Sequence, residues 1–324
     1  MHPVDIWEGR SFKATVLRGF LTPLSWLYAA GWQGYLALYR SGIKKASEPH
    51  RPIICIGNLV VGGTGKSPLT LYFAELLAGM DKEVVVGCSG YGSPRAEAAS
   101  IAPEGPLDAR EWGDEPAMVR WLLPHVPLVV GRRRVLAAEA VHRAFPDAVL
   151  LMDDGFQHLP LRKQVSIVLD DARPVNARCL PAGPYREPRK NRRRADLVLP
   201  SDFACVPEPM RLIDPDGNEQ TPTSYSVLCA LGQPDRFLTA LEAAFPNSKN
   251  GGVVRLLPDH DPLTGGTLLD TFPQHLPIVV TAKDWVKLRS REDVAKPRFL
   301  IALRKVRVEP EAEFKVWLKN RLDE

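Results

Sequence analysis

Cysteine is scarce in this sequence, and the five cysteines that occur form no familiar pairing or metal-binding pattern. They lie far apart, are odd in number and include no C-x-x-C pair (Cys55, Cys88, Cys179, Cys205 and Cys229). This spacing argues against a disulfide framework and against a zinc site. We therefore expect a reducing, cytosol-facing location.

A cleavable secretory signal is also missing from the first eighteen residues. Charged side chains are scattered through them (Asp5, Glu8, Arg10, Lys13 and Arg18), and no apolar core is followed by small residues. Export signals need such a core, so we expect the protein to stay on the cytosolic side. The sequence likewise shows no internal repeat and no low-complexity tract.

Strong overall charge is absent too, since the formal net charge is only +4. The positive residues are nevertheless clustered, at 132–134 and at 189–194. Local basic patches therefore matter more than the total. With 324 residues and 45% apolar content, the chain can bury one large core or two smaller ones.

The stretch from residue 19 to 39 carries no formal charge and is rich in tryptophan and tyrosine. Three explanations fit it: a membrane-spanning helix, a helix in the membrane interface, or an ordinary buried helix. Polar residues, a proline and glycines lower its apolarity, and its aromatic residues favour headgroup depth. We favour the interfacial helix. We expect it to begin at Thr22 and Pro23, an N-cap followed by proline, and to continue to about Arg40.

Strand and helix patterns alternate through the first two thirds of the chain, which predicts a mainly parallel sheet covered by helices. The expected strands are 52–56, 83–88, 127–130, 148–152, 165–169 and 197–199, and the expected helices are 68–80, 115–123 and 134–145. A smaller α/β unit is expected to follow. It has strands at 225–230, 253–256, 277–281 and 298–303, a helix at 234–244 and a final helix at 309–322.

A glycine-rich loop, GGTGKS at residues 62–67, stands between the first strand and the first helix of this sheet. Glycines let backbone N–H groups surround phosphate oxygens, Lys66 neutralises phosphate charge and Ser67 can bind Mg²⁺. The strict G-x-x-x-x-G-K-[ST] pattern is not met, because Val60 occupies the first glycine position. The expected nucleotide-binding residues are Val60, Val61, Gly62, Gly63, Thr64, Gly65, Lys66 and Ser67.

An acidic pair, Asp153 and Asp154, follows the apolar run at 149–152. This places both carboxylates at the C-terminal edge of the sheet, where ligands bind in open α/β folds. Two adjacent carboxylates repel each other, and a divalent cation relieves that cost. Two aspartates after a strand can also simply cap a turn. Together with the glycine-rich loop, they favour an Mg²⁺ site.

Several motifs occur together in a specific order. They are FLTPLSWLY at 20–28, GNLVVGGTGKSP at 57–68, GDEP at 113–116, DDGFQH at 153–158, LPAGPYREP at 180–188 and PDH at 258–260. With these motifs the sequence resembles the tetraacyldisaccharide 4'-kinase family of lipid A synthesis over nearly its whole length. The resemblance implies transfer of phosphate from ATP, with Mg²⁺, to the 4'-hydroxyl of an acylated glucosamine disaccharide 1-phosphate. It also implies a place on the cytoplasmic face of a bacterial inner membrane, either peripheral or N-terminally anchored.

The resemblance further implies a catalytic dyad of Asp114 and His260, which acts together with Lys66. A sugar hydroxyl is a poor nucleophile, so a carboxylate that accepts its proton and a histidine that orients the carboxylate suit the reaction. These two residues are far apart in the sequence, and we expect closure of two lobes to bring them together. Alternatively, Asp114 caps the helix at 115–123 and His260 is an ordinary loop histidine.

Further candidates are Glu115 for Mg²⁺ and Arg186 for phosphate, because a guanidinium matches phosphate oxygens in a fork. Tyr91 and His158 are weaker candidates for contact with the acceptor. The sequence departs from the family at Ser89, where arginine is more usual. Arg95 is one possible replacement for that arginine.

The expected fold is therefore α/β, a P-loop kinase core with a smaller second lobe and an N-terminal membrane-associating helix. The expected segments are 1–45 for the N-terminal helical segment, 46–202 for the core, 203–223 for an inter-lobe linker, 224–308 for the smaller lobe and 309–324 for a C-terminal helix.

Two other functions compete with the kinase interpretation. A P-loop GTPase or metallochaperone-like switch needs an [NT]-K-x-D motif, and TAKD at 281–284 has the wrong spacing. Nucleic-acid binding through the basic run at 186–194 lacks interleaved aromatic residues. We therefore expect no nucleic acid and no obligate protein partner. The expected partners are ATP, the lipid acceptor and a membrane surface.

Overall fold

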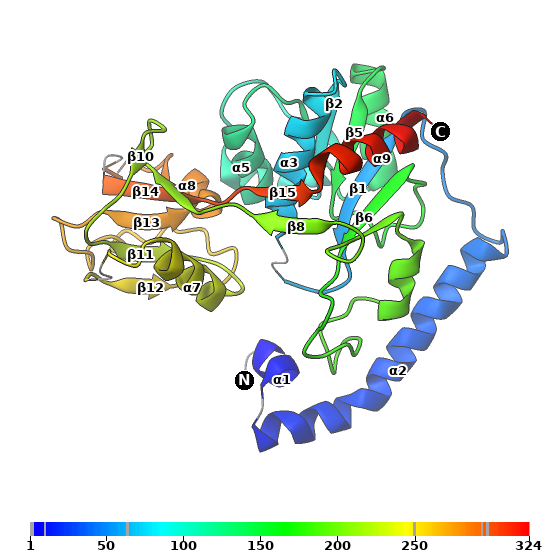
Figure 1. The fold of residues 1–324 in the computed structure, drawn as a ribbon, viewed down its shortest axis with the longest axis horizontal. Helices are drawn as coiled ribbons and strands as arrows, with labels where there is room; N and C mark the ends of the chain where they lie inside the picture. The colour runs from blue at the N-terminus through cyan, green and yellow to red at the C-terminus, as the bar shows by residue number, and fades with distance from the viewer. Residues whose placement is uncertain are drawn as a thin grey trace.

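The computed structural model describes residues 3–9, 11–62, 65–248, 251–292, 294–295 and 298–323. Figure 1 shows two sheets, each with its own helices, and a narrow two-stranded ribbon that runs between them. A long N-terminal helix extends away from both sheets. The expected α/β class, with a mainly parallel sheet, a smaller lobe and an N-terminal helix, is confirmed.

The first sheet has seven strands, and all neighbouring strands are parallel except β3 and β4. In spatial order they are β3 (Ser100–Ile101), β4 (Leu128–Val130), β2 (Val84–Cys88), β5 (Val149–Asp153), β1 (Ile53–Asn58), β6 (Val165–Leu169) and β7 (Leu197–Leu199). Strands β1 and β5 are buried along their whole lengths, as continuous apolar runs in parallel sheets usually are. Their register pairs Ile56 with Asp153, so both strands end at the same edge.

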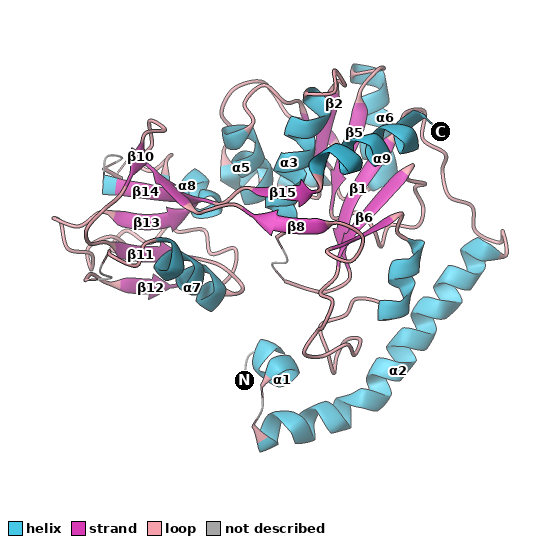
Figure 2. Cartoon of the chain, in the orientation of Figure 1, coloured by secondary structure: helices cyan, strands magenta, loops and turns pink. Residues whose placement is uncertain are grey.

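Helices cover both faces of this sheet (Figure 2). Alternate residues of a strand point to opposite faces, and Ile54 and Ile56 join the core that contains α3 (Lys66–Ala78), α5 (Asp114–Leu122) and α9 (Glu311–Asp323). Ile53 joins a second core with α6 (Arg134–Ala144) on the other face. Short helical segments complete this lobe: η1 (Pro94–Ala96), α4 (Ala109–Trp112) and η2 (Arg189–Arg194).

The second sheet has six strands, in the order β10 (Glu219–Gln220), β9 (Arg211–Ile213), β14 (Phe299–Leu303), β13 (Ile278–Thr281), β11 (Ser226–Cys229) and β12 (Val254–Leu256). Strands β14, β13, β11 and β12 run parallel to one another. Strand β9 pairs antiparallel with β14, and β10 pairs antiparallel with β9. The helices α7 (Pro234–Ala244) and α8 (Ala282–Leu288) accompany it. The sequence analysis expected only an inter-lobe linker at 203–223. Strands β9 and β10 lie in this segment and belong to the second sheet.

The chain crosses between the lobes twice. The crossings pair as the antiparallel ribbon of β8 (Ala204–Pro207) and β15 (Val306–Glu309), seen between the two sheets in Figure 1. After the second crossing α9 returns to the first lobe, where the rings of Phe314 and Phe73 lie 5.5 Å apart. The lobes also meet through α5 and α8, which pack against each other. This contact positions the candidate active site.

The N-terminal segment forms α1 (Pro3–Glu8) and the long helix α2 (Phe12–Arg40). The prediction that this helix begins at Thr22 is wrong, because Ser11 is its N-cap and Pro23 lies inside it. Thr22 instead donates its hydroxyl hydrogen to the carbonyl of Arg18, one turn earlier. Proline in a helix removes one backbone hydrogen bond and bends the helix, and the ribbon of α2 curves along its length in Figure 1.

Helix α2 is neither a core helix nor long and apolar enough in its sequence to cross a membrane. Only three of its residues are buried. No helix in the described parts of the chain meets the requirements for a membrane span.

Candidate active site between the two lobes

The glycine-rich loop lies between the end of β1 and the start of α3, where the sequence predicted it. Gly65 takes a left-handed conformation, with φ of 80°, as the cap of α3, and Lys66 and Ser67 form the first turn of that helix. The segment before Arg186 borders the loop, since the Val61 N–H donates to the carbonyl of Pro184 at 2.9 Å. Gly63 and Thr64, which the sequence also assigns to nucleotide binding, lie outside the described residues.

Asp154 forms ion pairs with two cations beside this loop. Arg186 Nη1 donates to both of its carboxylate oxygens at 3.0 Å, and Lys66 Nζ lies 3.6 Å from Oδ2. Burial by itself favours the neutral acid, but Lys66 and Arg186 outweigh it and hold the pKa of Asp154 below its usual value. Asp154 is therefore an ionised carboxylate held by two cationic side chains.

Asp153 is in a different environment, although it is the adjacent residue. Its side chain is buried at the end of β5, and its Oδ1 has no hydrogen-bond partner among the described residues. Burial, with the negative charge of Glu115 next in importance, raises the pKa of Asp153 to about 7. The buried guanidinium of Arg134 donates to the carbonyls of Asp153 and Asp154 at 2.5 and 3.1 Å and so fixes the backbone. An unpartnered carboxylate oxygen here fits a bound cation.

Asp114 and His260 come together across the two lobes. Asp114 Oδ2 lies 3.0 Å from His260 Nδ1, although the two residues are far apart in the sequence. Gly113, with φ of 92°, is the N-cap of α5, so Asp114 is the first residue of the helix and not its cap. His260 has a left-handed backbone, with φ of 63°, and its ring lies 5.2 Å from that of Tyr91. The alternatives of a helix cap and an isolated loop histidine therefore do not describe these side chains.

Lys283 completes this group, and sequence reasoning gave it no role. Its Nζ lies 3.3 Å from His260 Nε2, 3.7 Å from Asp114 Oδ2 and 3.5 Å from Asp259 Oδ1. An ammonium can only donate, so Nε2 of a neutral His260 accepts, and Nδ1 carries the hydrogen that faces Asp114. The only signal in the sequence was the TAKD segment at 281–284, whose last residue is structural: Asp284 is fully buried and paired with Lys287 at 2.9 Å.

The charges of this group shift the pKa values of both members of the dyad. Burial opposes ionisation of Asp114, but the hydrogen bond from His260 and the charge of Lys283 lower its pKa below the usual value. The hydrogen bond to Asp114 raises the pKa of His260, while burial and Lys283 act in the opposite direction. Asp114 is thus an ionised carboxylate near neutral pH, suited to accept a proton from a hydroxyl group.

The remaining candidates are placed as follows. Glu115 follows Asp114 in α5, near enough to Asp153 for its charge to raise the pKa of that residue. His158 lines a pocket of about 490 Å³ with Arg132 and Arg133. Its Nε2 is buried without a partner among the described residues, and burial lowers the pKa of His158 to about 4. Among the described residues, no hydrogen bond or ion pair joins His158 to the dyad.

Arg95, the replacement suggested for the arginine that is absent at position 89, contacts Glu111 and Trp112. Its guanidinium forms an ion pair with Glu111 and lies 5.6 Å from the ring of Trp112. The buried Arg134 donates to the backbone carbonyls of the acidic pair.

The basic run at 186–194 is largely used inside the protein. Arg189 and Arg192 pair with the buried Asp170, and Arg194 pairs with the fully buried Glu187. Helix α2 contacts the start of this run and the residues just before it. The Tyr28 hydroxyl donates to the carbonyl of Arg186. The Ser25 hydroxyl donates to the carbonyl of Cys179 and accepts from the N–H of Ala182. Arg186 is thus linked to the N-terminal helix through its own backbone.

A model of the family described as tetraacyldisaccharide-1-P 4'-kinase matches residues 17–323. The chain belongs to this family. It is therefore an enzyme of the phosphotransferase class.

Relatives and a solved structure agree with this assignment. Tetraacyldisaccharide 4'-kinase of Shewanella sediminis is 35% identical over 88% of this chain and 89% of its own length. The Pseudomonas paraeruginosa enzyme of the same name is 33% identical over 94% of this chain and 92% of its own. The crystal structure of the apo form of LpxK from Aquifex aeolicus in complex with ATP matches with a TM-score of 0.80, at 27% identity, over 94% of this chain and 99% of that one.

Proposed function

We propose that this tetraacyldisaccharide-1-P 4'-kinase family member transfers the γ-phosphate of ATP to the 4'-hydroxyl of a tetraacylated glucosamine disaccharide 1-phosphate. The reaction belongs to lipid A synthesis at the cytoplasmic face of a bacterial inner membrane. One observation carries the proposal: Lys66 and Arg186 converge on Asp154 beside the glycine-rich loop, and Asp114 on α5 pairs with His260 of the second lobe. The names of the relatives and the ATP in the related crystal structure support it.

The nucleotide is bound by the loop at 60–67. Backbone N–H groups and the start of α3 attract the phosphates, and Lys66 and Arg186 neutralise their charge. Both cations pair with Asp154 in this structure. A triphosphate competes with Asp154 for them, so the pairs keep the two side chains extended toward the phosphate site before ATP arrives.

Mg²⁺ fits the residues on this edge of the sheet. Within the described residues no three His, Cys, Asp or Glu side chains gather closely enough to hold a metal by themselves. Mg²⁺ usually needs only one or two carboxylates, because substrate phosphates and water complete its shell. Asp153, with its unpartnered Oδ1, and Ser67 are the first candidates, with Glu115 and Asp154 beside them. When bound, the cation neutralises charge on the phosphate oxygens.

Proton transfer is assigned to the dyad. Asp114 accepts the proton of the 4'-hydroxyl as its oxygen bonds to the γ-phosphorus and the bond from that phosphorus to the β,γ-bridging oxygen breaks, which releases ADP. His260 holds the carboxylate through its Nδ1–H. Lys283 contacts Nε2 of His260 and adds a positive charge that favours ionised Asp114. Because Asp114 lies on α5 and His260 in the second lobe, their separation depends on the α5–α8 contact.

The membrane surface is assigned to α2. Its exposed apolar side chains recur every three or four residues along one face, as in helices that lie in a lipid interface. They include Phe12, Val16, Phe20, Leu24 and Leu27, which are between 39% and 83% exposed. The hydrogen bonds from this helix to the Arg186 segment keep the lipid-binding helix next to the phosphate-transfer site.

The direct test is incubation of the purified protein with detergent-dispersed acceptor lipid, Mg²⁺ and radiolabelled ATP. We expect labelled lipid from the wild type, and a loss of at least about a hundredfold in Asp114→Asn, since general bases contribute about 10²–10⁴ in rate. A parallel reaction with GTP tests the GTPase alternative. Transfer to water with GTP but none to lipid with ATP contradicts the proposal.

A further inference from the structure

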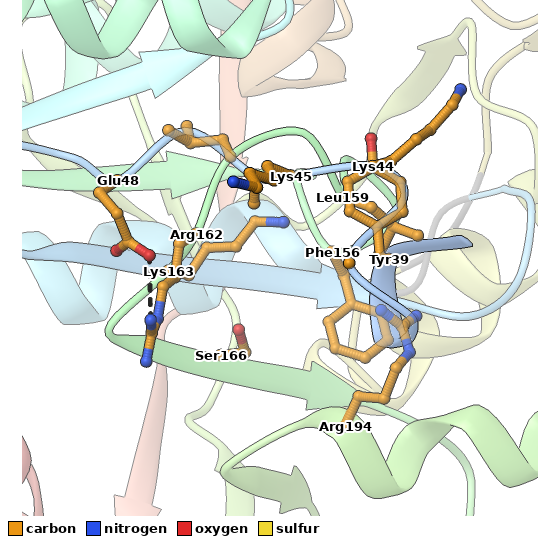
Figure 3. A pocket seen from close by; sticks show the side chains of 13 residues that line it. Tyr39, Lys44, Lys45, Glu48, Phe156, Leu159, Arg162, Lys163, Ser166 and Arg194 are labelled. Carbon is orange, nitrogen blue, oxygen red and sulfur yellow. Dashed lines mark hydrogen bonds and ion pairs between the residues drawn. The ribbon is translucent and has the colours of Figure 1, made fainter. Parts of the chain in front are cut away.

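A second basic cavity lies away from the dyad, at the C-terminal end of α2. It has a volume of about 560 Å³. One wall is the end of α2 with the linker after it, and the other is the segment after β5 with the start of β6 (Figure 3). None of its residues belongs to the nucleotide loop or the dyad.

The lining of this cavity is strongly cationic. Five basic side chains and a single carboxylate, Glu48, line it; the basic ones are Lys44, Lys45, Arg162, Lys163 and Arg194. Arg162 pairs with Glu48 at 3.0 Å, as the dashed line in Figure 3 shows, and Arg194 pairs with Glu187. Among the described residues the three lysines have no carboxylate in an ion pair. The lining of the cavity therefore carries five positive side chains and one negative side chain.

Lys163 is the most costly of these cations. Its side chain is half-buried, its Nζ donates to the carbonyl of His158 at 2.5 Å, and no carboxylate of the described residues forms an ion pair with it. Burial lowers the pKa of Lys163. Beside it, the guanidinium of Arg194 lies 4.4 Å from the centre of the Phe156 ring. A partly buried cation without a counter-charge is favourable only when an anion binds beside it.

The chemistry and position of the cavity define the anion. Ammonium groups on flexible stems bind phosphate as point charges. The volume admits a phosphorylated sugar or glycerol head. The cavity adjoins Tyr39 at the end of α2, about 20 Å along that helix from the exposed Trp26 at 1.5 Å per residue. A helix in the lipid interface therefore holds the cavity beside the polar headgroups.

We infer that this cavity binds a phosphate group carried on a lipid, with Lys45 and Lys163 as its main cationic contacts. The inference rests on the proposed lipid kinase function for its location at a membrane. The phosphate comes either from the anomeric 1-phosphate of the acceptor or from an anionic phospholipid of the bilayer. The two sources present the same chemistry to the lysines, so the experiment separates them.

Three variants test the site. Lys45→Ala removes one contact, and Ala46→Trp fills the cavity without changing any charge. Lys13→Ala is the matched control, because it removes an equally exposed lysine from the other end of α2 and so loses the same diffuse attraction to anionic lipid. Unchanged melting temperatures establish that each variant is folded.

The first arm measures KM for the acceptor in neutral detergent micelles, where the acceptor carries the only lipid phosphate. If its phosphate binds here, Lys45→Ala and Ala46→Trp raise KM about tenfold with little change in kcat, and Lys13→Ala does not. The second arm measures sedimentation with phosphatidylcholine vesicles that contain or lack phosphatidic acid. If a bilayer phosphate binds here, Ala46→Trp loses the gain in binding that phosphatidic acid gives the wild type.

A change in either arm supports the site and identifies the source of the phosphate. If folded Ala46→Trp matches the wild type in both arms, the inference is refuted. The proposed function then still stands, provided that the wild type phosphorylates the acceptor. A wild type without lipid kinase activity contradicts the proposed function instead, and the vesicle arm still decides whether the cavity binds lipid phosphate.

Discussion

Replacing Lys283 with methionine removes the ammonium beside the dyad and keeps most of the side-chain volume. The ammonium lies 3.7 Å from Asp114 Oδ2, and the two side chains are only 15% and 9% exposed. Two unit charges at this distance interact by about 1 kcal/mol in water and about 4 kcal/mol at an effective dielectric constant of 20. One pKa unit corresponds to about 1.4 kcal/mol, so the loss of Lys283 raises the pKa of Asp114 by about one to three units.

The sign of the effect on activity follows from the role of Asp114. A general base must be unprotonated, and the positive charge of Lys283 favours that form of Asp114. Lys283 also lowers the pKa of His260, so both members of the dyad bind protons more tightly without it. The acid limb of kcat/KM belongs to the coupled pair and moves to higher pH, by at least about one unit. The loss of activity is therefore largest at acid pH and shrinks as the pH rises.

The assay is the pH profile of kcat/KM for lipid phosphorylation, measured for the wild type, Lys283→Met and Lys283→Arg. The arginine variant restores a cation and recovers part of the shift. Lys319→Met, which removes an exposed lysine on α9, is the matched control and keeps the wild-type profile. If folded Lys283→Met has the wild-type acid limb, Lys283 does not tune the dyad and the reasoning from its position is wrong.

Three other predictions concern the acidic pair, the sheet and the N-terminal helix. Burial raises the pKa of Asp153 to about 7, so the ionisation of Asp153 destabilises the fold as the pH rises from about 4 to 7. Asp153→Asn should therefore raise the free energy of unfolding at pH 8 without Mg²⁺ by up to about 4 kcal/mol. The same variant should abolish stabilisation by Mg²⁺. Denaturant titrations with and without Mg²⁺ measure both, and a less stable variant contradicts the assignment. Gly57→Ala should lower the free energy of unfolding by about 1–3 kcal/mol, because the new Cβ lies 2.5 Å from Cβ of Phe156. Gly19→Ala on α2, with open space around it, should be neutral or slightly stabilising. Equal costs for the two variants would argue against the close contact at Gly57. Phe20→Glu should reduce sedimentation with vesicles, whereas Val316→Glu, at an exposed apolar position on α9, should not; equal behaviour would remove the role of α2.

Much of the fold could be predicted because its local signals are strong. The strands at 165–169 and 197–199 and the helix at 234–244 have the predicted limits. Buried parallel strands read as continuous apolar runs, and the glycine-rich loop is defined by residues adjacent in the sequence. Strands β9 and β10 escaped prediction because they are two or three residues long and have no detectable period.

The start of α2 shows how a local signal can mislead. Thr22 and Pro23 have the composition of a helix start. In the protein the helix already runs through them from Ser11, and the hydroxyl of Thr22 bonds one turn back. A cap motif indicates only that its residues favour the start of a helix. It does not exclude a bent helix that continues through those residues.

By itself, the sequence predicted a glycine-rich nucleotide loop and an acidic pair and, through resemblance, the two members of a dyad. Only the tertiary structure decided that Lys283 joins Asp114 and His260, and that Asp154 is paired while Asp153 has an unpartnered oxygen. It also decided that the basic run pairs with buried carboxylates. The partners of these charged side chains come from distant segments of the sequence. The packing of α5 on α8, and of one strand on the next, brings those segments together. Short-range sequence patterns carry no information about that packing.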